Sequence, residues 1–313
     1  MDEKLQRGET GNFVFRASVK MEAIKSHKEF ARIFTCANVQ MGVLFRKYFL
    51  PIFRLLHMDA LGCGNTLGIN VHSLDWDNLA RSFRYPHRMI AGDYKNFDQF
   101  LPPFLIQAAG ETLVCLACEA EYSPSQITAM RTLVYEIAHP MVECAQTVFQ
   151  LFLHVSGQHG TLVFNNLMNM ILWRYVYYHQ RPERELVNVP FDKRASYCVD
   201  ESVCGDDHVL SVSPDVENFD QVVMREVLAG VGIEYTDDSK VKDFTNRFVH
   251  LEELTYLSRL RKVAFIASSI TSVITSDKSM NSNSANQFSK SFIPLPIFAV
   301  FSIAHIICNG FLS

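Results

Sequence analysis

Apolar residues recur at helical spacing in several stretches of the chain. They are dense between Val39 and Leu56, where basic side chains stand between them. Further along, apolar residues are three or one apart at Phe164, Leu167, Met168, Ile171, Leu172 and Tyr175. This spacing predicts an amphipathic helix. Pro102 and Pro103 suit a helix start, so we expect a helix over Phe104–Cys118. The pattern of Phe219–Leu228 is also helical.

Shorter apolar runs with turn residues predict strands. Arg88–Asp93 is typical of a short buried strand that ends in an acidic residue. Ser202–Val212 predicts a strand, a tight Gly-Asp-Asp turn and a second strand, which together form a hairpin. Helices and strands that mix in this way indicate an α+β fold.

The composition is that of a globular protein. Of the 313 residues, 48% are hydrophobic and 20% charged, and the net charge is −4. This balance disfavours a protein that holds nucleic acid through a basic outer surface alone, although it allows a local basic channel. The first residues are polar, no secretory signal follows them, and eight cysteines are scattered along the chain. We therefore expect an intracellular, cytoplasmic protein with reduced thiols.

The composition changes near residue 263. From there to the end, only Asp277, Lys278 and Lys290 are charged. A Ser/Asn-rich stretch is typical of a linker, and the apolar segment Phe292–Leu312 follows it. That segment is long enough to span a bilayer, but it contains two prolines near its start and a histidine further on. We expect a buried or disordered terminal segment rather than a transmembrane helix.

Carboxylates stand at two places where a strand ends. Asp93 closes the predicted strand 88–93, and Asp206 and Asp207 occupy the predicted hairpin turn. Paired carboxylates at a turn need a cation, and hard oxygen ligands suit Mg²⁺ or Mn²⁺. If the strand end and the turn lie together, the carboxylates have the geometry of a two-metal phosphoryl-transfer site. The alternative is that Gly-Asp here is ordinary turn chemistry.

A second group of polar residues accompanies these carboxylates. Asp98 follows the first strand and can face another part of a substrate, or it can cap the next segment. The loop that begins with Ser156 contains two glycines, of which Gly157 allows close approach to a substrate backbone. Thr161 and Asn165 are four residues apart, so they share a helix face and can bind a sugar hydroxyl. The alternative is that Thr161 only caps the helix.

These segments, in this order, resemble the RNA-dependent RNA polymerases of picorna-like viruses, in particular dicistro-like and ifla-like viruses of insects. Asp93–Asp98 resembles motif A of that family, Ser156–Asn165 resembles motif B, and Gly205–Asp207 resembles motif C. Gly232–Lys240 resembles motif D and Thr255–Arg259 resembles motif E. Asp2–Leu5 and Arg32–Phe34 resemble the two ends of motif F. The resemblance covers roughly residues 1–262.

The resemblance implies a role for each matching residue. Asp93 and Asp206 would hold two Mg²⁺ or Mn²⁺ ions, and Asp207 would assist. Lys240 would act as general acid on the departing pyrophosphate. Binding of the ribonucleotide is implied for the remaining matches: Arg32 at the triphosphate, Asp98 and Asn165 at the ribose 2′-hydroxyl, and Ser156, Gly157 and Thr161 around them. The partners would be an RNA template, an RNA primer and ribonucleoside triphosphates.

The resemblance also implies an architecture. Residues 1–87 would be partial fingers, and 88–262 a right-hand polymerase palm, an antiparallel sheet with packed helices that carries a fingers insertion at about 100–155. Residues 263–313 do not resemble a thumb. In the family a long fingers region precedes motif F, and the resemblance places Met1 within that region. A helical thumb follows motif E in the family, whereas only 54 residues follow Arg259 here. We expect the isolated chain to have weak or no polymerase activity.

We therefore interpret the chain as an RNA-directed RNA polymerase, a nucleotidyltransferase of viral RNA replication. A reverse transcriptase is one alternative, which the glycine before Asp206 and the Asp98 and Asn165 pair disfavour. The other is a non-catalytic RNA-binding protein that derives from a viral insertion in a host genome.

Overall fold

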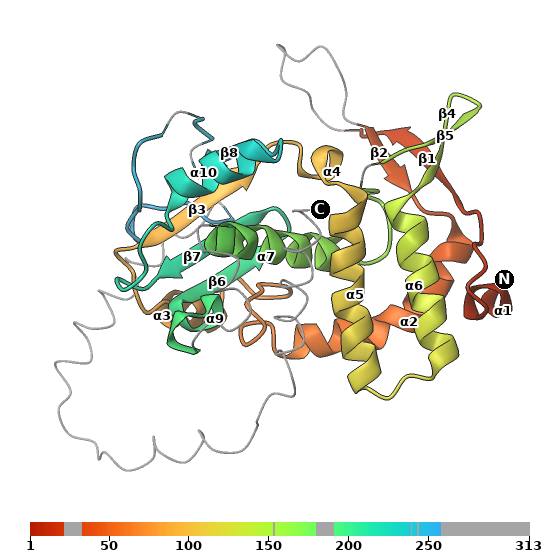
Figure 1. Ribbon diagram of the computed structural model, residues 1–313, viewed down its shortest axis with the longest axis horizontal. Coiled ribbons are helices and arrows are strands. Elements are labelled where there is room, and N and C mark those ends of the chain that lie inside the picture. The colour runs from red at the N-terminus through yellow and green to blue at the C-terminus, as the bar shows by residue number, and fades with distance from the viewer. Residues whose placement is uncertain (22–32, 153, 180–190, 239, 243, 258–313) are drawn as a thin grey trace.

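The computed structural model describes residues 1–21, 33–152, 154–179, 191–238, 240–242 and 244–257. The first half contains α1 (Asp2–Gln6), β1 (Val14–Val19), β2 (Ile33–Cys36), α2 (Val39–Met58), α3 (Leu74–Ser82), β3 (Met89–Tyr94), α4 (Phe97–Phe100), α5 (Pro103–Glu119) and α6 (Pro124–Ala138). The second half contains β4 (Met141–Cys144), β5 (Thr147–Gln150), α7 (Thr161–His179), the 3₁₀ turn η1 (Phe191–Lys193), α9 (Ala195–Cys198), β6 (Val199–Cys204), β7 (Asp207–Val212), α10 (Gln221–Gly230) and β8 (Tyr235–Asp237). The strands form two sheets (Figure 1).

We call β6-β7-β3-β8 the inner sheet, in which every neighbouring pair is antiparallel. The predicted hairpin is confirmed as β6 and β7, although β6 begins at Val199. The predicted strand 88–93 is confirmed as β3, at the centre of the sheet. The expectation of an antiparallel sheet with packed helices is therefore correct.

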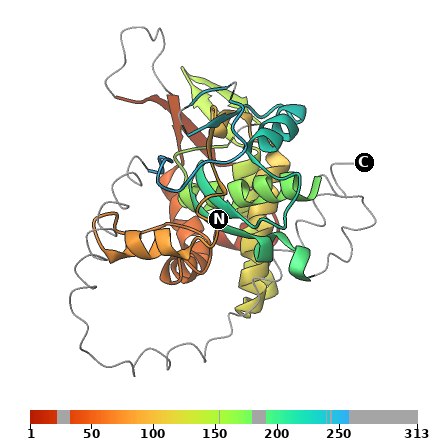
Figure 2. The ribbon, with the colours of Figure 1, turned by 90° about the vertical axis from the view of Figure 1, so that its left-hand side faces the viewer.

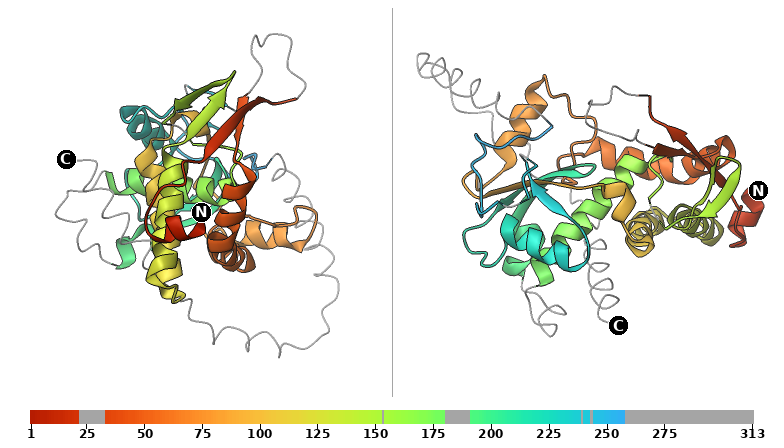
Figure 3. Two further views of the ribbon diagram at one scale, coloured as in Figure 1. Left: turned by 90° about the vertical axis from the view of Figure 1, so that its right-hand side faces the viewer. Right: turned by 90° about the horizontal axis from the view of Figure 1, so that it is seen from above.

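Both faces of the inner sheet are covered. Ile90 and Leu210 point into the large core against α7 and α10, whereas Met89 and Val209 point into a smaller core on the other face. There Trp76 of α3 stacks on Tyr256, with the ring planes 7° apart. Figure 2 and the right panel of Figure 3 show α3 and α10 on opposite sides of the sheet. Burial on both faces explains why β3 begins with the consecutive apolar residues Met89, Ile90 and Ala91.

We call β2-β1-β4-β5 the outer sheet. The pair β1–β4 is parallel, and the other two pairs are antiparallel. One face packs inward through Phe15 and Val142, whereas all four residues of β5 are exposed. Helices α5 and α6 pack beside it, and α1 lies against α6 (Figure 3, left). The sequence analysis did not predict these strands.

The expectation of an amphipathic helix at 164–175 is wrong in one respect. The helix exists as α7, but most of its residues are buried, including the polar residues Asn166, Asn169 and Arg174. It runs between the inner sheet and α5 and contacts elements on both sides (Figure 1). A helix enclosed in this way must pair its polar side chains internally.

The other predicted helices are confirmed. Helix α2 begins after Asn38, whose side chain accepts a hydrogen bond from the Met41 N–H. Helix α5 begins at Pro103. The last predicted helix begins later than expected, because Asp220 caps α10 by accepting from the N–H groups of Val222 and Val223.

Some expectations fall partly or wholly outside the described residues. Of Thr255–Arg259, which resembles motif E, only 255–257 are described, and they form no strand. The tail 263–313, with its apolar segment, is not described at all. Among the residues that are, no helix is long and apolar enough to cross a membrane.

Candidate active site

A pocket of about 940 Å³ opens where β3 ends and the β6–β7 turn begins. Six of the predicted site residues line it: Asp93, Asp98, Ser156, Asn165, Asp206 and Lys240. They come from β3, α4, the loop before α7, α7 itself, the hairpin turn and the segment after β8. The fold thus brings together residues that lie far apart in the sequence.

The carboxylates of this pocket lie in a partly buried environment. Gly205, with φ of +70°, makes the tight turn that presents Asp206. Burial raises the pKa of Asp206, and the negative charges of Asp93 and Asp98 raise it further. Burial and the neighbouring carboxylates raise the pKa of Asp207 to about 6. Asp207 begins β7 and does not line the pocket. The site therefore holds more negative charge than it can stabilise on its own.

The ammonium group of Lys240 lies against this negative charge. Lys240 Nζ donates to Asp93 Oδ2 at 2.7 Å, and this hydrogen bond raises the pKa of the lysine. As the side chains lie, no group of three His, Cys, Asp or Glu residues in the described part of the chain is arranged to hold a metal ion. The donors nevertheless fit a hard divalent cation, because they are crowded carboxylate oxygens whose charge a cation would offset. The Lys240 side chain thus pairs with Asp93 although it is largely exposed.

Two asparagines of α7 hold the hairpin turn. Asn166 Oδ1 accepts the Gly205 N–H at 2.5 Å, and its Nδ2 donates to the Val203 carbonyl at 3.3 Å. Asn169 Nδ2 donates to the carbonyl oxygens of Gly205 and Asp206 at 3.1 and 2.9 Å. Neither residue was predicted from the sequence. The available signal was that Asn166 and Asn169 lie within a mostly apolar helix.

The glycine loop before α7 packs on the protein itself. A Cβ added at Gly157 would lie 2.1 Å from the Thr35 carbonyl oxygen of β2. Thr161 Oγ1 donates to the carbonyls of Ser156 and Gln158 at 3.0 and 2.8 Å. Neither Gly157 nor Thr161 lines the pocket. In this structure they fix the loop, and Ser156 faces the pocket.

Several lysines at the pocket rim were not singled out as site residues. Lys95 and Lys242 both pair with Glu234, at 3.2 and 2.6 Å. These bonds lower the pKa of Glu234, with Lys242 the larger cause. Lys20 also lines the pocket, at the end of β1. Arg32, predicted to contact a triphosphate, lies outside the described residues.

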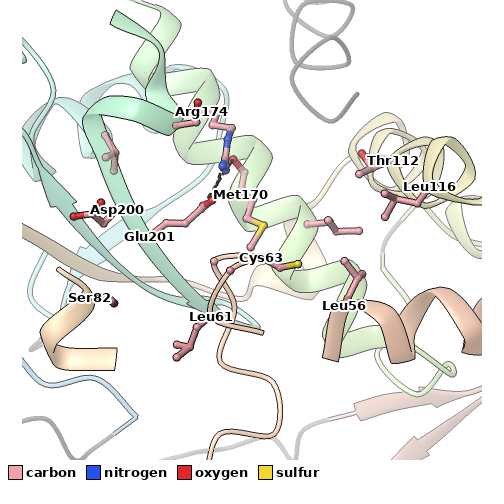
Figure 4. Close-up of a pocket in the computed structure, with 15 residues that line it drawn as sticks. Leu56, Leu61, Cys63, Ser82, Thr112, Leu116, Met170, Arg174, Asp200 and Glu201 are labelled. Carbon is pink, nitrogen blue, oxygen red and sulfur yellow. Dashed lines mark hydrogen bonds and ion pairs between the residues drawn. The ribbon is translucent and has the colours of Figure 1, made fainter. Parts of the chain in front are cut away.

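A second cavity, of about 340 Å³, is lined by residues of α2, α5, α7 and β6 (Figure 4). Leucine side chains and Met170 line it, together with the ion pair between Arg174 and Glu201. Burial raises the pKa of the Cys63 thiol there to about 11. The predicted site residues are not among those that line this cavity.

Comparison with known proteins identifies the family of this arrangement. Residues 4–264 match the family model of viral RNA-dependent RNA polymerases. The chain is 27% identical over 241 residues to the RNA1 polyprotein of Broad bean wilt virus 2, covering 76% of this chain and 12% of that protein. It is equally similar, at 27% over 242 residues, to the replicase polyprotein of Cricket paralysis virus, covering 73% of this chain and 13% of that protein. The chain thus spans about an eighth of the length of these relatives.

The fold is also similar to a solved structure. A Sicinivirus 3Dpol RNA-dependent RNA polymerase matches with a TM-score of 0.66 and 17% identity, covering 82% of this chain and 52% of that chain. The fold class expected from the sequence is therefore confirmed. The viral relatives likewise confirm the resemblance to polymerases of picorna-like viruses.

Proposed function

We propose that this chain, which belongs to the viral RNA-dependent RNA polymerase family, carries the catalytic centre that adds ribonucleotides to an RNA 3′ end on an RNA template. The observation that carries the proposal is the pocket itself. It combines Asp93 and Asp206 with Asp98, Ser156 and Asn165 in one space of about 940 Å³. Carboxylates that can bind a divalent cation thus lie beside polar groups that can bind a sugar hydroxyl.

In this proposal Asp93 and Asp206 hold divalent cations, Mg²⁺ or Mn²⁺, and Asp207 assists from the start of β7. When bound, such ions activate an attacking hydroxyl and neutralise charge on the leaving phosphate. The two asparagines of α7 contribute by fixing the turn, so that Asp206 needs no rearrangement before it acts. Preorganised groups of this kind lower the barrier without a cost at the moment of reaction.

Lys240 has two positions in the proposed cycle. Its side chain is 75% exposed, so it can leave Asp93 when a cation binds there. The ammonium group then remains within reach of a leaving pyrophosphate and can donate a proton to it as general acid. Lys95 and Lys242 at the rim add positive charge on the same side, which Glu234 partly offsets.

Asp98 and Asn165 would bind the ribose 2′-hydroxyl, which distinguishes RNA precursors from DNA precursors. Ser156 lies beside them at the pocket wall, held by the bond from Thr161 to its carbonyl.

The proposed partners are accordingly an RNA template, a primer and ribonucleoside triphosphates in the host cytoplasm. The proposed division is partial fingers over 1–87 and palm over 88–262, with the fingers insertion at about 100–155. The pairing of β4 with β1 supports that division.

The test is primer extension on a homopolymeric RNA template with Mg²⁺ or Mn²⁺, using the chain and two variants. We expect slow incorporation of ribonucleotides by the parent and none by Asp206→Ala. Asp215→Asn, which changes an aspartate outside the pocket, is the matched control and should match the parent. Incorporation that survives in Asp206→Ala would contradict the proposal. Absence of incorporation in the parent, with RNA binding intact, would instead favour the non-catalytic alternative.

A further inference from the structure

His154 lies two residues before Ser156 and is 1% exposed. Its backbone N–H donates to the Asp98 carbonyl at 3.0 Å. This bond joins the loop before α7 to α4, so His154 fixes the main chain that carries Asp98. The residue thus touches one half of the pair that is proposed to bind the 2′-hydroxyl.

The imidazole interacts with the other half. Burial lowers the pKa of the ring to about 4, and an interaction with the side-chain amide of Asn165 acts in the opposite direction. The ring is therefore neutral at neutral pH, with one N–H donor and one acceptor nitrogen. Neither ring nitrogen, nor Asn165 Oδ1, completes a well-formed hydrogen bond, and all three atoms are buried.

These atoms are complementary. An imidazole N–H can donate to Asn165 Oδ1, and buried polar atoms are normally paired. When Oδ1 accepts from the ring, the Nδ2 group of the amide is the part left to face the pocket. Asp98 then presents an acceptor and Asn165 a donor to the same ligand.

A ribose 2′-hydroxyl needs this combination, because it both donates and accepts a hydrogen bond. With the amide reversed, the pocket would present two acceptors to a group that has a single proton to donate. The orientation of one amide therefore decides whether the hydroxyl is fully bonded.

We propose that His154 is a positioning residue for sugar selection, which orients the Asn165 amide through its imidazole and places Asp98 through its backbone. This inference rests on the proposed polymerase function, since it assigns a reason for the ribose preference of that site. His154 itself need not touch the nucleotide.

The first test measures kcat/KM for ATP and for 2′-deoxyATP on a poly(U) template. In His154→Leu we expect the ratio of the two values to fall about tenfold, the equivalent of one hydrogen bond. His154→Gln, which keeps a donor, should retain most of the parent's ratio. Gln158→Leu is the matched control, because it removes another buried polar side chain from the same loop and should leave the ratio unchanged. Equal loss for both nucleotides in His154→Leu would show a merely structural role and overturn the inference.

The second test does not require activity. Nitrogen-15 NMR of the nucleotide-free chain should show a neutral His154 ring whose N–H signal shifts in Asn165→Leu. Ring signals that are the same in the parent and in Asn165→Leu would overturn the inference, even if the chain polymerises RNA. If the parent incorporates no nucleotide, the proposed function fails, and the NMR result still decides whether His154 orients Asn165.

Discussion

The two sheets of this molecule differ in how they are covered. The inner sheet is buried on both faces, by α7 and α10 on one side and by α3 with Tyr256 on the other. The outer sheet packs through one face only, and all four residues of its edge strand β5 are exposed. Asp93 lies on the inner sheet and Asp206 in its hairpin turn, whereas from the described part of the outer sheet only Ile33 and Phe34 line the pocket, with Lys20 just beyond β1.

The ion pairs of the two regions differ in the same way. Behind the inner sheet, Arg174 and Glu201 form an ion pair whose side chains are 8% and 14% exposed, and two asparagines bind the hairpin turn. The ion pairs of the outer region are exposed, although its Glu136 is buried and accepts from the N–H groups of Asn12 and Phe13. The ion pair behind the inner sheet is thus shielded from water, whereas water solvates those of the outer region. Substitutions in ion pairs should therefore cost more behind the inner sheet.

The largest effect is expected for Arg174→Met. It leaves the Glu201 carboxylate buried with only the Trp173 indole N–H as a remaining side-chain donor from α7. Breaking a buried ion pair from one side costs about 3–5 kcal/mol of unfolding free energy. Urea denaturation followed by circular dichroism measures it. The double variant Arg174→Met with Glu201→Gln should recover a large part of that loss, since it removes the uncompensated charge.

Asn166→Ala should have the next largest effect. It removes the acceptor of the buried Gly205 N–H and one donor to Val203. An unpaired buried donor costs about 1–3 kcal/mol. Because the turn carries Asp206, we also expect primer extension to fall at least about tenfold, beyond what the lost stability explains. Unchanged extension at a temperature where the variant is fully folded would argue against a role for α7 in fixing the turn.

Glu136→Ala tests the outer region in the same way. The substitution leaves the N–H groups of Asn12 and Phe13 without their carboxylate. We expect a loss of about 1–2 kcal/mol, confined to the N-terminal segment. Hydrogen exchange should therefore quicken in residues 10–19 and stay unchanged in β3 and β7. If the inner sheet loosened equally, the contrast between the two sheets would be wrong.

The sequence predicted the inner sheet better than the outer sheet, for a physical reason. Burial on both faces makes Met89–Ala91 of β3 and the central Val209 and Leu210 of β7 apolar, and the glycine of the turn marks the hairpin between β6 and β7. The outer strands are short and half exposed, so they leave no comparable pattern. Similarly, Asp93 and Asp206 could be predicted to meet because each ends a buried strand.

The remaining site residues depend on contacts that periodicity does not encode. Lys95 meets Glu234 because β8 pairs with β3, and Lys242 meets it because the chain turns back after β8, where Asp237 and Val241 bond to each other. The buried amides Asn166 and Asn169 find partners in the carbonyls of a turn more than thirty residues away along the chain. Because these amides find internal partners, α7 can be buried on most sides, whereas its sequence pattern predicts an amphipathic helix.

A smaller effect concerns pH. Burial lowers the pKa of His154 to about 4, whereas the residue would titrate near 6.5 when unfolded. Between these values the unfolded chain binds a proton that the folded chain does not, so stability falls as the pH falls. From pH 7.5 to 5.5 the parent should lose about 1 kcal/mol more than His154→Gln. Urea denaturation measures the unfolding free energy of both proteins at the two pH values. The difference between the proteins cancels the contributions of the other titrating groups.

The smallest effect is expected for Arg131→Met, which matches Arg174→Met in chemistry and differs in burial. Arg131 of α6 pairs with Glu111 of α5 at 2.9 Å, and the two side chains are 56% and 41% exposed. Such a pair contributes about 0–1 kcal/mol, because water solvates either partner once the other is removed. The variant should therefore unfold within about 1 kcal/mol of the parent, and added salt should reduce even that difference. A loss near that of Arg174→Met would mean that burial does not separate the two regions, and the comparison of the sheets would have to rest on the hairpin turn alone.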